Sequence, residues 1–113
     1  MRAPFISLVF TMFAVGCATA PSKQALSDSA ASVNTAEQLG AANVPQASKA
    51  LEYAQHEVAW AKALMINGRH ERALLMALRA ESDAALAIAL VRAFKAREAA
   101  EQAATPGATA PNP

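Results

Sequence analysis

The only cysteine of this 113-residue chain, Cys17, directly follows the run Ala14-Val15-Gly16 near the N-terminus. A thiol with no second cysteine in the chain cannot form an intramolecular disulfide bond. Its neighbours are Ala, Ser and Pro residues, which are typical of a flexible segment and not of a core. Covalent modification of the sulfur is therefore the chemistry that this position offers.

Residues 1–16 have the parts of a secretory signal: a basic start at Arg2, an apolar stretch over 5–15 and small residues before Cys17. The stretch is roughly half as long as the run of about 20 apolar residues that a membrane-spanning helix needs. We therefore predict a signal peptide over 1–16 and exclude it from the fold. Export into an oxidising compartment also agrees with the single cysteine.

The sequence Ala14-Val15-Gly16-Cys17 resembles the lipobox that the lipoprotein signal peptidase reads. It departs from that motif at Ala14, where Leu, Val or Ile is usual. The resemblance implies that Cys17 carries a diacylglyceryl group and a fatty acyl chain such as palmitate, and becomes the mature N-terminus. Because Ala18 and not Asp follows the cysteine, the family's sorting rule implies the outer membrane, facing the periplasm.

A second cut site competes with this one. Ala18-Thr19-Ala20 is an A-x-A pattern that ordinary signal peptidase uses, and cleavage there would discard Cys17 and leave a soluble secreted domain. The new first residue would be Pro21, which that enzyme handles poorly. We prefer lipidation and keep the second cut as the alternative.

Few other residues of the chain form groups suited to catalysis or to metal binding. Glu52 and His56 stand four apart on one predicted helix face, but two ligands make a poor metal site. Glu81 and Asp83 lie near Arg79 and are interpreted as solvated or ion-paired, and not as a catalytic pair of carboxylates. The sequence therefore predicts no metal site, no cofactor, no catalytic residue and no small-molecule substrate.

Two aromatic residues, Tyr53 and Trp60, are seven apart and so lie on one side of a predicted helix. Such a pair can stack on a sugar or a peptide, or it can fill the core or a helix interface. We consider both residues candidate contacts for a partner.

The charge of the chain is balanced, with 10 Lys and Arg against 9 Asp and Glu. Removal of Arg2 with the signal would leave nine of each, so the net charge directs the mature chain neither to nucleic acid nor to anionic lipid headgroups. The high alanine content and the few β-branched residues favour helix. We expect one small all-α domain.

We predict three helices, joined by a short reversal, over 24–39, 45–66 and 71–104. Segment 17–23 is predicted to be a lipidated tether, 24–104 the helical domain and 105–113 a disordered Pro-rich tail. Gly40 ends the first helix, which Ser residues weaken, and Pro45 begins the second. The second and third helices form an antiparallel hairpin at Gly68, with the first helix beside it in coiled-coil-like packing.

The third helix carries a heptad seam made mostly of alanine. It would extend roughly 15 to 18 Å beyond the second helix, and its residues 84–91 are apolar nearly all round. We expect the first helix or a second copy of the chain to cover this overhang. Leu86, Leu90 and Phe94 are therefore candidate partner contacts. The seam comprises Ala73, Ala77, Ala80, Ala84, Ala87, Val91 and Phe94.

Small and apolar residues recur through the body of the chain at Gly40, Ala41, Pro45, Ala50, Leu51, Ala54, Val58, Gly68, Ala73, Ala80, Ala84, Leu86 and Ala87, with Asp83 before Ala84. In these residues the body resembles the family known as domain of unknown function 4398, which comprises small alanine-rich bacterial envelope lipoproteins. The resemblance implies an exported, membrane-anchored helical domain of uncharacterised role and brings no catalytic residues. The hairpin also resembles one tetratricopeptide unit in Trp60, Gly68, Ala73 and Ala80, with Glu57 where that unit has an aromatic residue.

Together these features predict a membrane-anchored, non-enzymatic envelope lipoprotein that works through protein contacts or self-association. The alternative is a soluble periplasmic or secreted adaptor that binds a peptide or a cell-wall fragment through Tyr53, Trp60 and the groove of the hairpin.

Overall fold

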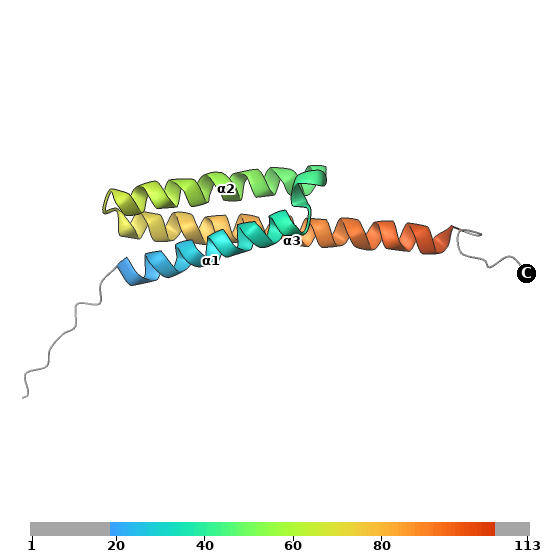
Figure 1. Ribbon diagram of the computed structural model, residues 1–113, viewed down its shortest axis with the longest axis horizontal. Helices are drawn as coiled ribbons and strands as arrows, with labels where there is room; N and C mark the ends of the chain where they lie inside the picture. Colours follow the sequence, from blue (N-terminus) through green and yellow to red (C-terminus); the bar gives the residue numbers. More distant parts are fainter. Residues whose placement is uncertain (1–18, 106–113) are drawn as a thin grey trace, which may run out of the picture.

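The computed structural model describes residues 19–105, and this part of the chain is all-α. It contains the helices α1 (Thr19–Gln38), α2 (Pro45–Ile66) and α3 (His70–Ala104), with a short 3-10 helix, η1 (Ala41–Asn43), between the first two. The three long helices lie side by side and alternate in direction, so the start of α1 lies beside the α2–α3 turn (Figure 1). The predicted hairpin with an additional N-terminal helix is confirmed.

Small side chains line the axis of the bundle. The predicted seam of α3 is buried from Ala73 to Val91 and ends before Phe94, which is partly exposed. The other helices carry the same seven-residue repeat of small residues, and side chains this small let helix axes approach closely. The fully buried positions of the repeat are Ser22, Ser29 and Ala36 in α1 and Ala47, Ala54 and Ala61 in α2.

The first helix begins five residues earlier than expected, so residues 19–23, which we had predicted to be a tether, belong to α1. Ser22 is fully buried and Ala25 nearly so, which makes this segment part of the packed repeat. Pro21 is tolerated because it lies in the first turn, where its missing N–H has no helical acceptor. Tertiary packing thus overrides the weak helix propensity of the serines. The predicted tail from residue 106 lies outside the described residues.

Both predicted helix stops are confirmed. Gly40 has φ 88° and leads into η1, whose Ala41 and following Val44 are buried. Gly68 has φ 71°, and it is enclosed by a hydrogen bond from its own N–H to Met65 O and one from Arg69 N–H to Leu64 O. This pair of bonds is a Schellman motif, which requires a residue in the left-handed conformation at the position of Gly68.

The overhang of α3 differs from the prediction. α1 lies along the hairpin and not over the overhang, because it starts beside the α2–α3 turn and has nearly the length of α2 (Figure 1). Every residue from 92 to 104 is exposed, and most of these residues are alanine or charged. The apolar positions Ala84, Ala87 and Val91 are instead buried within the bundle. The overhang is present, but it is not apolar, because Ala84, Ala87 and Val91 lie in one core with Val33 and Ala36 of the first helix.

The turn conformation can be tested with Gly68→Val. A Cβ at this position would meet no atom within 4 Å, so any loss of stability reflects backbone strain alone. We expect the free energy of unfolding to fall by more than about 1 kcal/mol, since a β-branched residue is strained at positive φ. Thermal and denaturant unfolding would measure the change. Gly68→Asn, which tolerates this conformation better, is the matched control, and equal loss in the two variants would contradict the assignment.

The close packing of the seam can be tested with Ala80→Leu. Ala80 is fully buried, so the larger side chain should overpack the helix interface and lower the free energy of unfolding by about 1 to 3 kcal/mol. Ala85→Leu, at an exposed position of the same helix, is the control and should leave stability nearly unchanged. Unfolding curves that coincide for the two variants would mean that the seam is open at Ala80.

Candidate functional site

The predicted anchor lies next to the folded unit. Cys17 itself is outside the described residues, but it comes only two residues before Thr19, where α1 begins. Two residues span at most about 7 Å in any conformation. Ala25 forms a buried cluster with Ala61 of α2 and Ala77 of α3, which fixes this end of α1 beside the α2–α3 turn. None of the helices within residues 19–105 is long and apolar enough to span a bilayer.

The aromatic pair lies on the surface. Tyr53 is 54% exposed and Trp60 is 59% exposed, so the interpretation that they fill the core is wrong. Both flank the α2 seam, whose buried positions are occupied by alanine at 47, 54 and 61. The two residues are therefore available for contact.

Trp60 lines two adjoining surface hollows beside the α2–α3 turn. One, of about 510 Å³, is lined by Ala63, Asn67 and other residues of α2 and the turn. The other, of about 310 Å³, runs between α2 and α3, and no residue of α1 lines either hollow. Sequence reasoning found Trp60 but missed the partners that α3 brings to it. The second hollow is lined by Trp60, Leu64, Arg69, Arg72, Leu75 and Met76.

The other predicted contact residues follow each other along one side of α3. Leu86 and Phe94 are each about half exposed, while Leu90 is partly buried and packs against the core. Phe94 lines a hollow of about 300 Å³ with Val44, Pro45 and residues near it, at the opposite end of the bundle from Trp60. The structure therefore does not bring the five predicted contact residues together in one site.

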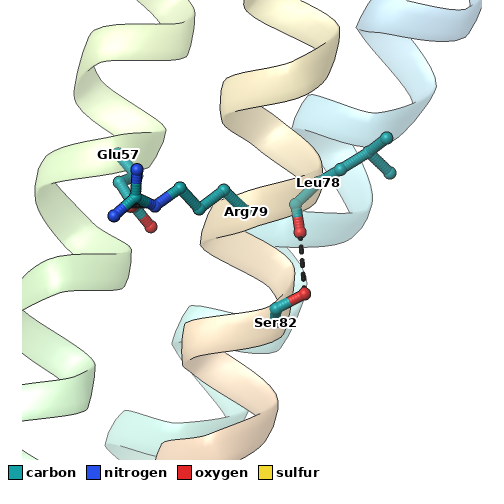
Figure 2. A network of polar contacts seen from close by, with 4 residues as sticks. All are labelled: Glu57, Leu78, Arg79 and Ser82. Carbon is teal, nitrogen blue, oxygen red and sulfur yellow. Dashed lines mark hydrogen bonds and ion pairs between the residues drawn. The ribbon is translucent and has the colours of Figure 1, made fainter.

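A buried carboxyl group lies between α2 and α3. Glu57 is almost fully buried. Its Oε1 forms a salt bridge with Arg79 Nε at 2.7 Å. Figure 2 shows Arg79 extending from α3 toward Glu57 on α2, beside the bond that Ser82 Oγ donates to Leu78 O at 3.2 Å. The predicted neighbours of Arg79 were Glu81 and Asp83 of its own helix, but its ion pair crosses to α2.

The pKa of the Glu57 carboxyl is raised above its usual range. Burial is the largest cause, followed by hydrogen bonding and charge repulsion from Asp83, and the attraction of Arg79 opposes them. Glu57 Oε2 has no hydrogen-bond donor in the described part of the chain. Two carboxylates cannot hydrogen-bond each other until one of them takes up a proton. Burial and the neighbouring Asp83 therefore shift the protonation equilibrium of Glu57 toward the neutral acid.

Neither Glu57 nor the Glu52–His56 pair lines the hollows beside Trp60. Glu57 lies in the interface between two helices and not in either of the hollows beside Trp60. Glu52 and His56 are both largely exposed, with 4.0 Å between His56 Nε2 and Glu52 Oε1. Within residues 19–105 no three or more His, Cys, Asp or Glu side chains gather as metal ligands would.

Sequence reasoning missed Glu57 as a buried residue, although one signal was present. Glu57 is three residues after Ala54 and four before Ala61, which places it on the seam of α2. A glutamate in a stripe of alanine is more often interpreted as a solvated position at its edge. The structure shows that it is enclosed by the hairpin instead.

Comparison with models of known protein families, with curated proteins and with solved structures finds no match to this chain. The resemblances drawn from its motifs therefore stay predictions. The fold and the positions of the residues carry the functional argument.

The raised pKa of Glu57 predicts a pH dependence of stability. A raised pKa in the folded state means that folding takes up a proton between the ordinary glutamate pKa of about 4.3 and the raised value. This contribution to the free energy of unfolding is fully present below the ordinary pKa and is lost as the pH rises through the raised one.

Glu57→Gln removes that dependence because glutamine stays neutral. Relative to the wild type, the variant should become more stable as the pH is raised from 4 to 7, as measured by the free energy of unfolding in chemical denaturation. Glu52→Gln, at an exposed position on the same helix, should show no such gain. A Glu57→Gln variant that becomes relatively less stable as the pH rises would mean that attraction to Arg79 outweighs burial.

Proposed function

We propose that this chain is a bacterial envelope lipoprotein, held by a lipid on Cys17 at the periplasmic face of the outer membrane. The observation that carries the proposal is the place of the only cysteine, which ends a signal-like apolar segment and comes two residues before the folded unit begins. Cleavage before Cys17 leaves the whole of α1 in the mature chain. The lipid would then be joined almost directly to the helical domain.

The structure weighs against the competing cut after Ala20. That cut falls within α1 and would make Pro21 the first residue, directly before the fully buried Ser22. The mature chain would then lose the first two residues of the helix and place a charged amino group beside a packed position. The positive charge of this amino group would lie at the N-terminus of the shortened helix, where the helix dipole disfavours a cation.

We propose further that the domain acts through protein contacts and not as an enzyme. Its one buried ionisable residue, within the described range, joins two helices and does not face a hollow. The exposed Leu86 and Phe94 of α3 offer apolar area for a protein partner or a second copy. No cofactor enters this proposal.

The soluble adaptor is the second candidate, and the exposure of Trp60 beside a hollow favours it. In this proposal the hollow takes a peptide or a cell-wall fragment, and Trp60 stacks on it. An exposed indole emits at long wavelength, so a blue shift when muropeptides are added would support capture. An unchanged spectrum at saturating muropeptide would count against it.

Cys17→Ser tests the anchor. In cells grown with a fatty-acid probe, the wild-type chain should take up the label and fractionate with membranes, while the variant should be unlabelled, because an alcohol does not replace the thiol in this modification. Ala14→Leu restores the usual lipobox residue and should give at least as much labelled protein as the wild type. Equal labelling of wild type and Cys17→Ser, or none in either, would contradict the proposal.

A further inference from the structure

The place of the anchor determines which end of the bundle faces the membrane. Cys17 is no more than about 7 Å of chain from Thr19, and the start of α1 packs beside the α2–α3 turn through Ala25, Ala61 and Ala77. A lipid on Cys17 would therefore hold the turn against the bilayer surface. The far end of α3 would extend away from it (Figure 1).

The side chains at this end have the chemistry of a membrane interface. Ile66 is 86% exposed and Leu75 is 66% exposed, and Trp60 is the only tryptophan of the chain. Tryptophan is enriched where acyl chains meet headgroups, because its ring is apolar and its N–H needs a polar partner. Within the described residues, no side chain covers the exposed apolar area of Trp60, Ile66 and Leu75. In a monomer in water, this area would face solvent.

The charges at this end are complementary to phosphate. Within residues 59–76 the cations Lys62, Arg69 and Arg72 outnumber the single acid, Glu71. Arg69 and Arg72 line the same hollow as Trp60, which places guanidinium groups beside the apolar ring. Guanidinium groups bind phosphate oxygens through paired hydrogen bonds.

We propose that the α2–α3 turn end of the bundle is a membrane-docking surface that binds the anionic phospholipid headgroups around the anchor. Trp60 and Ile66 enter the interface, and Arg69 and Arg72 bind lipid phosphates. This inference rests on the proposed lipid anchor at Cys17. It assigns Trp60 to the membrane, and it leaves Leu86 and Phe94 for the protein partner.

The test separates docking from lipidation by supplying the anchor chemically. The chain from Cys17 to Pro113 retains all the described residues and has one thiol, so a maleimide lipid couples to it at a single position. The coupled protein is bound to vesicles of phosphatidylethanolamine and phosphatidylglycerol that contain lipids brominated near the headgroup. Trp60 fluorescence should be quenched several-fold more than in vesicles without bromine.

A double variant moves the indole to the other end of the bundle. Trp60→Phe with Phe94→Trp retains an aromatic residue at both positions, and Phe94 is partly exposed at the opposite end of α2. The tryptophan of this variant should not be quenched. Equal quenching in the two proteins would mean that the bundle lies flat on the membrane, and no quenching in either would mean that it stands clear of it; both outcomes overturn the proposal.

A second pair of variants tests whether Arg69 and Arg72 bind the headgroups. Arg69→Gln with Arg72→Gln should reduce the quenching of Trp60 at least two-fold, while Arg92→Gln with Arg97→Gln, on the exposed end of α3, should not. Equal effects of the two pairs would overturn the headgroup contact. If Cys17→Ser keeps the fatty-acid label in cells while the coupled protein still docks, the proposed anchor fails and the docking surface stands.

Discussion

The close approach of three helices through small side chains is the constraint on which this structure depends. Alanine and serine bury little apolar area, so each seam position contributes less to hydrophobic stabilisation than a leucine would. Side chains this small permit a short separation between helices, with many weak dispersion contacts along α2 and along α3 as far as Val91. Larger residues are consequently displaced to the flanks, where Tyr53, Trp60 and Leu86 are exposed.

The same constraint explains which parts of the fold could be predicted from the sequence. The α3 seam was predictable because alanines at alternating steps of four and three lie on one face of a helix. The turn was predictable because a glycine after Asn67 is typical of a helix end in the left-handed conformation. The start of α1 was not, because a serine such as Ser22 looks like a loop residue, although in a narrow seam its size matters more than its polarity.

The candidate site was less predictable than the fold. Cys17 could be found because its signal is local, whereas Glu57 and the hollow around Trp60 depend on how α2 and α3 align across the turn. No spacing within one helix shows that Arg79 faces Glu57 or that Arg72 faces Trp60. The overhang was misjudged for a related reason, since the apolar residues of α3 lie level with α1 and α2 and not beyond them.

The exposed end of α3 has a thermodynamic consequence. None of residues 92–104 is buried, and a helix of about this length is barely stable alone in water because its first turn is costly to form. Here the buried part of α3 supplies that first turn, so the end elongates from an existing nucleus, and each added turn changes the free energy only slightly. The number of formed turns is therefore a thermal average, and a partner that binds there selects the length of the helix.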